Sequence, residues 1–322
     1  MNDAEVYQAF EPLYGDIKPE AQFFNARPLL AHYTTIQTIE QIVKSKQMWF
    51  ANPLYMNDIE EVGFGLIVGE NAINSSQALS DACGTPERRQ LFMQAYGHYS
   101  RHYIENHLAD TYVLCFSRHE PNDNDGLLSM WRGYGGNGNG AAIVIDTAKI
   151  NALPTSSLIL AHVEYATTQA RRDWLAALVT RFSSILAALN LPDEQIHIAA
   201  SALLDRVKLA ALFSKHKGFD EEKEWRVVYM RERDPNKVFD PMLSYMTSAR
   251  GIEKKLKFKI AYHPGATAED LCLSKVVDRI ILGPTVSSPI AVAAFTRMLA
   301  EHGEPDLIPR VVASTIPYRH KA

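Results

Sequence analysis

Two amphipathic helical patterns lie in the middle of a chain that otherwise contains mainly short apolar runs. Apolar residues recur at helical spacing over 174–189 and again over 198–217, where Gly218 is expected to end the second helix. Runs typical of buried strands precede these patterns, at 111–117 and at 141–146. The spacing therefore predicts a helical hairpin inserted in a framework of β-strands.

The remaining segments favour a mixed α+β fold. Early strands alternate with helices whereas later strands cluster, which argues against a regular doubly wound sheet. Ser288, Pro289 and Gly303 mark the start and the end of a last helix. We predict one α+β domain over 1–322, with helical insertions at about 57–110 and 168–217. Further strands are predicted at 48–51, 158–165, 224–230, 255–262, 279–282 and 308–314.

Composition excludes several classes of protein. Three cysteines without a CxxC spacing do not fit a disulfide framework or a structural zinc site, so we expect a reducing compartment. The first residues lack a secretory signal, and no apolar run approaches the roughly 20 residues of a membrane helix, which predicts a cytoplasmic protein without a membrane partner. A net charge of −4 gives no global case for nucleic-acid binding. The basic patches at 208–217 and 251–259 could each be a local site, a solvated helix face or an edge strand.

An acidic run at 219–224 leads directly into the predicted strand 224–230. Because side chains alternate along a strand, Glu222, Glu224 and Arg226 are expected to share one side of it. Two interpretations fit this spacing. Either a carboxylate points from the end of the strand into a cleft, or both acids solvate an exposed edge.

A polar triplet, His32, Tyr33 and Thr34, stands where a predicted strand passes into a helix. Thr34 followed by Gln37 is a capping-box pattern, which places the helix start here. Free amides at a helix start can meet a ligand together with neighbouring side chains, so His32 could donate to a ribose hydroxyl. A buried, hydrogen-bonded histidine beside an ordinary helix cap explains the same residues.

The segment around Trp131 puts two aromatic rings and a cation beside the glycine-rich run 133–140. Trp131 and Tyr134 could stack on a planar heterocycle while Arg132 holds a diphosphate, or the tryptophan could simply anchor the core. The glycine run precedes a strand and lacks the Gly-Lys-Ser/Thr ending of a phosphate loop. We therefore interpret it as a turn.

In their order along the chain, these motifs resemble a large bacterial family recorded mainly as a domain of unknown function. The resemblance extends from about 30 to 284, and the ordered set is far more specific than any single motif. Three of the motifs are HYT at 32–34, MWR-Y at 130–134 and ExEWR at 222–226. The others are Asn52-Pro53, Asn57-Asp58, Cys115-Phe116-Ser117, Gly140, Lys215-His216 with Phe219, and Ile281-Leu282-Gly283-Pro284.

That family in turn resembles the ADP-ribosyltransferase superfamily, in which an early histidine, a middle-strand hydroxyl or aromatic residue and a late glutamate surround NAD. The resemblance implies a mainly antiparallel split sheet with NAD as substrate and no metal. It implies that His32 is the early histidine and that Glu224 is the catalytic acid. Glu222 completes an ExE pair and is the alternative principal acid. The residues implied in NAD binding are Tyr33, Thr34, Ser117, Trp131, Arg132, Tyr134 and Arg226.

Cleavage of the bond between nicotinamide and ribose passes through an oxocarbenium-like state, which a nearby carboxylate stabilises more than it stabilises the ground state. The resemblance therefore implies an NAD-dependent ADP-ribosyltransferase-like enzyme, a toxin or antiviral defence effector by analogy, with an unidentified protein or nucleic-acid acceptor. A plain NAD glycohydrolase is one alternative. The other is a non-catalytic interaction module that binds a regulatory partner through the helical hairpin, which a contiguous exposed apolar patch on the hairpin would favour.

Overall fold

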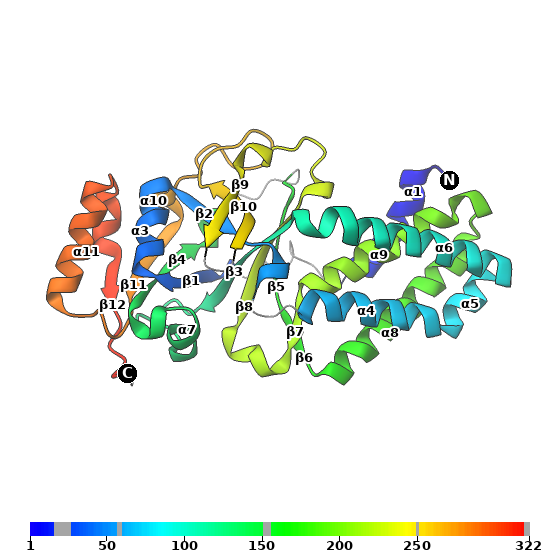
Figure 1. The fold of residues 1–322 in the computed structure, drawn as a ribbon, viewed down its shortest axis with the longest axis horizontal. Coiled ribbons are helices and arrows are strands. Elements are labelled where there is room, and N and C mark those ends of the chain that lie inside the picture. Colours follow the sequence, from blue (N-terminus) through cyan, green and yellow to red (C-terminus); the bar gives the residue numbers. More distant parts are fainter. Residues whose placement is uncertain (16–26, 57–59, 151–155, 249–250, 319–322) are drawn as a thin grey trace. The chain divides into compact units, whose positions relative to one another are not determined.

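The computed structural model describes residues 1–15, 27–56, 60–150, 156–248 and 251–318. The chain forms two compact units, whose elements are labelled in Figure 1. The helical unit comprises Met1–Lys18, Asn52–Thr111 and Val163–Phe219, and the sheet unit comprises Pro19–Ala51, Tyr112–His162 and Asp220–Ala322. The prediction of a single domain stays a prediction, and the motif residues Asn57 and Asp58 lie outside the described residues.

Helices fill most of the two ranges that the sequence predicts as helical insertions. In the helical unit, α9 packs against α4 and α6, and α5 packs against α8. Gly65 of α4 permits the close approach to α9, because a Cβ at this position would lie 2.5 Å from that of Ala211. The main helices of this unit are α1 (Asp3–Gln8), α4 (Glu60–Ser75), α5 (Gln77–Cys83), α6 (Pro86–His102), α8 (Thr168–Leu189) and α9 (Ile196–Leu212).

Helix α9 ends earlier than the sequence predicts. Leu212 is its last residue, and Ser214–His216 form the short strand β7, which pairs in parallel with β6 (Glu164–Ala166). The Phe213 carbonyl accepts a hydrogen bond of 2.9 Å from the Glu164 N–H, so pairing with β6 replaces the last helical turns. The prediction that Gly218 ends this helix is therefore wrong.

A seven-stranded sheet forms the centre of the sheet unit, in the order β12-β11-β4-β1-β3-β8-β5. Strand β1 is antiparallel to β3 and β4, β11 is antiparallel to β4, and β5 is antiparallel to β8, whereas β11 and β12 are parallel. The predicted mixed α+β class with a mainly antiparallel sheet is thus confirmed. The strands are β1 (Leu29–Thr35), β3 (Thr111–His119), β4 (Gly140–Asp146), β5 (Leu158–His162), β8 (Glu224–Met230), β11 (Val277–Leu282) and β12 (Val311–Ala313).

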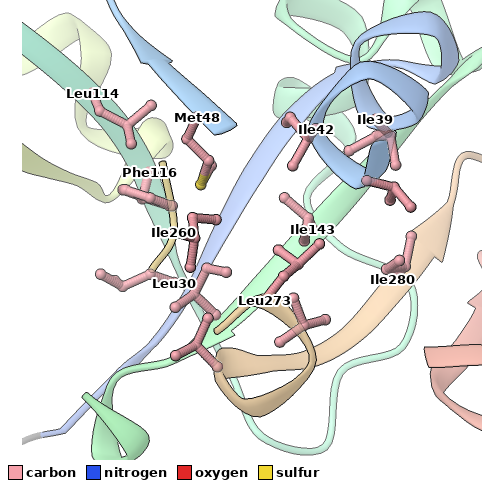
Figure 2. Close-up of a cluster of buried hydrophobic side chains, with 14 of the residues drawn as sticks. Leu30, Ile39, Ile42, Met48, Leu114, Phe116, Ile143, Ile260, Leu273 and Ile280 are labelled. Atoms are coloured by element: carbon pink, nitrogen blue, oxygen red, sulfur yellow. The ribbon is translucent and has the colours of Figure 1, made fainter. Parts of the chain in front are cut away.

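Alternation along the strands gives this sheet two different faces. The face of Leu30 and Ile143, here called the apolar face, buries a large cluster of aliphatic and aromatic side chains. Figure 2 shows Ile39 and Ile42 of helix α3 pointing into this cluster above Ile143. The helices of the sheet unit are α3 (Ile36–Ser45), α7 (Leu128–Gly133), α10 (Leu273–Val276) and α11 (Pro289–Glu301).

The opposite face, here called the α7 face, is partly covered by the short helix α7. Ala31 and Tyr33 of β1 and Val144 of β4 pack there against Met130 and Trp131. Trp131 is fully buried in this second cluster. The predicted alternative of a core-anchoring tryptophan is therefore confirmed, and the indole offers no surface on which a ligand could stack.

The helix after β1 begins one residue later than the capping-box pattern predicts. Strand β1 continues to Thr35, whose hydroxyl accepts a hydrogen bond of 3.1 Å from the Thr38 N–H and caps α3. Thr34 stays on the strand and does not cap the helix. The last helix begins as predicted, with Ser288 as its N-cap and Pro289 as its first residue.

A second sheet consists of three antiparallel strands in the order β2-β10-β9, and one side of it packs against the apolar cluster. The sequence predicts β2 (Gln47–Phe50) and most of β10 (Gly251–Lys259) but not β9 (Leu243–Ser248). In β9, Leu243 packs against the core whereas Tyr245 is largely exposed, so the strand lacks a sustained apolar pattern. Its existence depends on pairing with β10.

Candidate functional site

The acidic end of β8 lies on the α7 face of the sheet. Trp225 and Tyr229 belong to the cluster on the apolar face, so Glu224 and Arg226, which alternate with them, project to the other side. The alternation predicted for Glu224 and Arg226 is confirmed, whereas Glu222 lies in a 3₁₀ turn before the strand and does not take part in it. Both charged side chains of β8 therefore lie on the α7 face.

Glu224 and Arg226 form a buried ion pair. Arg226 Nε donates to Oε1 of Glu224 at 2.8 Å, and its Nη2 donates to Oε2 at 3.0 Å. The two residues are only 5% and 3% exposed. This fork-on-carboxylate geometry holds the Glu224 side chain in one orientation, and it directs the Arg226 guanidinium at the acid.

Ser117 lies next to this ion pair across β3 and β8. The Arg118 N–H donates to the Lys223 carbonyl, and the Tyr112 ring stacks on the Tyr229 ring with centroids 6.3 Å apart. Between these two contacts, β3 and β8 advance by the same number of residues in opposite directions. The strands are therefore antiparallel, with Ser117 opposite Glu224. The Ser117 side chain is fully buried, and its hydroxyl has no hydrogen-bond partner among the described residues.

Glu222 precedes β8, at the end of a 3₁₀ turn, and lies partly exposed on the same face. The Tyr134 hydroxyl, one residue after α7, donates to Oε1 of Glu222 at 2.8 Å. The Tyr134 side chain is 41% exposed. The acidic turn and the segment after α7 thus present a carboxylate and an accessible aromatic ring together.

The loop between β3 and α7 is fixed by buried aromatics. The Tyr33 hydroxyl accepts a hydrogen bond of 2.9 Å from the Leu127 N–H, and Trp131 Nε1 donates to the Asp125 carbonyl at 2.8 Å. Burial raises the pKa of Tyr33 to about 12. Tyr33 is therefore a neutral phenol that positions this loop, and its place inside the second cluster removes it from direct contact with a ligand.

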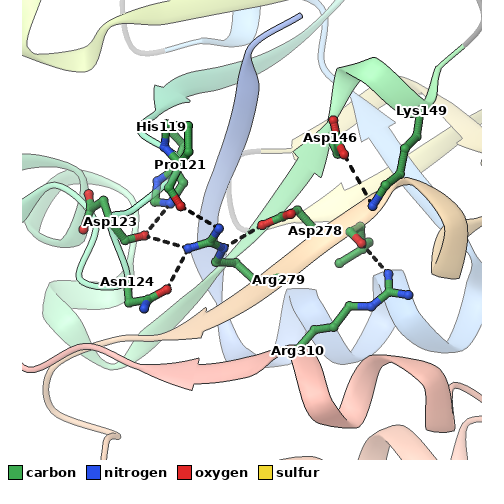
Figure 3. A network of polar contacts seen from close by, with 10 residues as sticks. His119, Pro121, Asp123, Asn124, Asp146, Lys149, Asp278, Arg279 and Arg310 are labelled. Carbon is green, nitrogen blue, oxygen red and sulfur yellow. Dashed lines mark hydrogen bonds and ion pairs between the residues drawn. The ribbon is translucent and has the colours of Figure 1, made fainter.

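A charged network from β11, which the sequence does not reveal, supports the same loop (Figure 3). Arg279 Nη1 donates to Asn124 Oδ1 at 2.7 Å, and its Nη2 donates to the Pro121 carbonyl at 2.8 Å. Asp278 accepts from Nε of the same guanidinium at 2.6 Å. Arg279 thus anchors the loop that carries α7. In the sequence, the only sign of this network is that Asp278 directly precedes Arg279.

The C-terminal segment also contacts this region. The Thr315 hydroxyl donates to Oδ1 of Asp125 at 2.9 Å, and the hydrogen bonds from Thr315 lower the pKa of that carboxyl. The Tyr318 ring lies 5.4 Å from the Arg132 guanidinium carbon. Arg132, which the sequence predicts at a diphosphate, is therefore held beside an aromatic ring of the C-terminal segment.

Glycines of the predicted motifs have packing roles. A Cβ on Gly140 would lie 2.1 Å from the Thr34 carbonyl, and one on Gly283 would lie 2.4 Å from the Gly138 carbonyl. The glycine-rich run forms a short 3₁₀ turn before β4, as predicted. The backbones of this turn, β1 and the end of β11 approach too closely for any side chain.

His32 lies on the apolar face, away from the acids. It shares the side of Leu30, and its ring contacts Phe116 edge-on at 5.8 Å. Its Nδ1 donates to the Cys115 carbonyl at 2.9 Å, which fixes the tautomer and leaves Nε2 as the acceptor. Burial lowers the pKa of His32. The structure therefore brings Glu222, Glu224, Ser117, Tyr134 and Arg226 to one face and does not bring His32 to them.

Neither a membrane helix nor a metal centre is found in the part of the chain that the structure describes. No helix there combines the length and the hydrophobicity that a membrane crossing requires. No group of three or more histidine, cysteine or acidic side chains there could hold a metal ion.

Part of the chain matches a known protein family. A family model described as Protein of unknown function (DUF2971) matches residues 130–227. The matched range begins in α7 and ends in β8, so it includes Tyr134, Glu222 and Glu224 but not His32 or Ser117. No curated protein and no solved structure matches this chain. The chain therefore contains a DUF2971 domain of unknown function at residues 130–227.

Proposed function

We propose that this protein is an NAD-consuming enzyme of the ADP-ribosyltransferase type, with Glu222 as its principal acid. The hydrogen bond of 2.8 Å between the Tyr134 hydroxyl and Glu222 carries the proposal, because it joins an accessible aromatic ring to a partly exposed carboxylate. A nicotinamide ring can stack on such an aromatic side chain. The attached ribose would then bring its hydroxyls to the carboxylate.

The chemistry that this arrangement supports is cleavage of the N-glycosidic bond. The bond from ribose C1′ to the nicotinamide nitrogen breaks, its electron pair leaves with neutral nicotinamide, and positive charge develops on the ribose. Glu222 would accept a hydrogen bond from a ribose hydroxyl and stabilise that charge in the transition state. The acceptor, which is water or a nucleophile on a protein or nucleic acid, then bonds to C1′ and releases a proton.

Glu224 takes a supporting role in this proposal. Because both of its oxygens bind the Arg226 guanidinium, Glu224 acts as a positioning residue that keeps the start of β8 rigid below Glu222. The Ser117 hydroxyl opposite Glu224 has no partner among the described residues, but it is fully buried, so we assign it no contact with NAD. His32 stabilises β1 and takes no part in the reaction.

The test uses NAD labelled in its adenylate part, with protein, RNA and DNA as candidate acceptors. We expect Glu222→Gln to lower the rate of label release and transfer by about 10²–10³-fold, as for removal of one electrostatic stabiliser. Glu221→Gln is the matched control, because Glu221 is an exposed acid of the same turn and the charge change is the same. It is expected to keep the wild-type rate.

The outcome separates the roles of the residues. Label that stays in free ADP-ribose indicates a glycohydrolase, whereas label on a macromolecule identifies the acceptor. Loss of activity in Glu224→Gln together with full activity in Glu222→Gln would reverse the order of the two acids. A wild-type protein that releases no more label than Glu222→Gln would refute the enzyme proposal.

A second candidate function is a non-catalytic interaction module, as part of a toxin or antiviral defence system. The observation in its favour is the ion pair that already neutralises Glu224, together with the position of His32 on the other face of the sheet. The hairpin gives it little support, because no large apolar side chain is exposed at 168–217, all of which the structure describes. A partner, if any, would have to bind another surface.

A further inference from the structure

The outer side of the small sheet, opposite its packed side, carries an exposed aromatic ring among polar and cationic side chains. In the register of β2 and β10, Trp49 lies opposite Lys257 and Gln47 lies opposite Lys259. The core residues Met48 and Phe50 alternate with Trp49 and face the other way. The outer surface thus consists of an aromatic ring, an amide and two ammonium groups, and we call it the Trp49 surface.

The indole of Trp49 is held in place by its neighbours. Lys257 Nζ lies 4.3 Å from the ring centroid, and Trp49 Nε1 donates to Oε1 of Gln47 at 3.3 Å. The side chain is nevertheless 41% exposed. A large aromatic ring that is oriented before a ligand arrives loses little conformational freedom when it binds one.

The charge of this surface is positive but limited. Lys255 also projects to this side of β10, but it pairs with Glu253 and adds no net charge. Lys257 and Lys259 supply the remaining two cations. The surface can therefore neutralise about two phosphates while the indole offers a face for stacking.

We propose that the Trp49 surface binds single-stranded nucleic acid, with a base stacked on Trp49 and the adjacent phosphates on Lys257 and Lys259. A single strand fits better than a duplex, because only unpaired bases expose a face to an indole. The proposal is independent of NAD chemistry. The Trp49 surface belongs to the small sheet that packs on the apolar face, whereas Glu222 and Tyr134 lie on the α7 face.

The test measures binding of the full chain to a fluorescein-labelled pyrimidine 12-mer by anisotropy at low salt. We expect Trp49→Ala to weaken binding about 5- to 150-fold, the range for one stacked base. Two phosphate contacts predict a slope of about −1.4 for the logarithm of affinity against that of salt concentration. Tryptophan fluorescence gives a second measurement. Quenching on binding should be lost in Trp49→Phe, because Trp49 is 41% exposed, Trp131 and Trp225 are buried, and the partly buried Trp174 lies in the helical unit.

Matched variants separate this site from general attraction of an anion. Lys259→Glu should weaken binding and reduce the salt slope by about 0.7. Lys254→Glu changes the same charge on the same strand but on its other side, opposite Tyr245, and should leave binding unchanged. Trp49→Phe keeps a ring at this position and should retain most of the affinity, which controls for misfolding of the alanine variant.

Several results would overturn the proposal. These are an absence of binding to the single strand at low salt, an equal loss in Lys254→Glu and Lys259→Glu, and equal affinity for a duplex or for anionic lipid vesicles. Glu222→Gln should bind the oligonucleotide like the wild type. Failure of the NAD proposal and failure of this one are therefore seen in different measurements.

Discussion

The two faces of the seven-stranded sheet bury different chemistry. The apolar face buries a continuous cluster of side chains around Leu30 and Ile143. On the α7 face, strands β3 and β8 bury a hydroxyl without a partner at Ser117 and an ion pair between Glu224 and Arg226. Buried apolar contacts stabilise a fold, whereas buried ion pairs and unpartnered hydroxyls contribute little to it or oppose it. We propose that function lies on the face that buries these polar groups.

The largest effect is expected where one member of the ion pair is removed. Arg226→Met removes the guanidinium that binds both oxygens of the buried Glu224 carboxylate, so we expect the free energy of unfolding to fall by about 3–5 kcal/mol. Urea denaturation at neutral pH measures this free energy of unfolding. The double variant Glu224→Gln with Arg226→Met removes both charges and should recover most of the loss. A single variant as stable as the double variant would contradict the assignment of a costly buried pair.

On the apolar face, truncation of a side chain should act through packing alone. Ile143 lies fully buried on the central strand β4, so Ile143→Ala should lower the free energy of unfolding by about 2–5 kcal/mol. Ile290→Ala is the matched control, because that isoleucine is 81% exposed. It should change stability by no more than about 0.5 kcal/mol in either direction. Equal effects of the two substitutions would mean that Ile143 does not lie in the core.

A substitution at Ser117 is expected to raise the free energy of unfolding, whereas the two substitutions above are expected to lower it. Ser117→Ala removes a buried hydroxyl that has no partner among the described residues, so unfolding should require about 1 kcal/mol more. The control Ser183→Ala removes a buried hydroxyl that donates to the Val179 carbonyl at 2.8 Å and should not stabilise the protein. Destabilisation by Ser117→Ala would show that the hydroxyl has a partner in solution.

The sequence predicts the elements that a local pattern determines and misses those that depend on distant partners. The strand at Glu224–Met230 and the helix capped by Ser288 follow from alternation and capping, and both are found. Strand β9 exists only through pairing with β10, and α9 loses its last turns to pairing of β7 with β6. Neither partner can be identified from a local pattern.

The candidate site shows the same limit. Alternation correctly puts Glu224 and Arg226 on one side of β8, but the side of the sheet that His32 occupies depends on the register of β1 against β3 and β4. A shift of the β1 register by one residue would have put His32 on the same side of the sheet as the acids. Arg279, which fixes the loop before α7, lies more than a hundred residues from the atoms that it binds, and no spacing rule connects them.

The smallest predicted effect is a pH dependence that comes from the apolar face. Burial lowers the pKa of His32 below its ordinary value of 6.5, so at pH values just below 6.5 the unfolded chain binds more protons than the folded chain. The contribution of His32 is therefore fully present above pH 6.5 and is lost as the pH falls from there toward the lower folded pKa.

Unfolding measured between pH 7.5 and 5 should show a loss of stability on acidification, part of which disappears in His32→Gln. His119, whose pKa is also lowered by burial, accounts for a further part. An unaltered profile in His32→Gln would mean that Nε2 of His32 takes up its proton in the folded protein without a cost in stability, and hence that this side of the sheet is more open to water than its apolar neighbours imply.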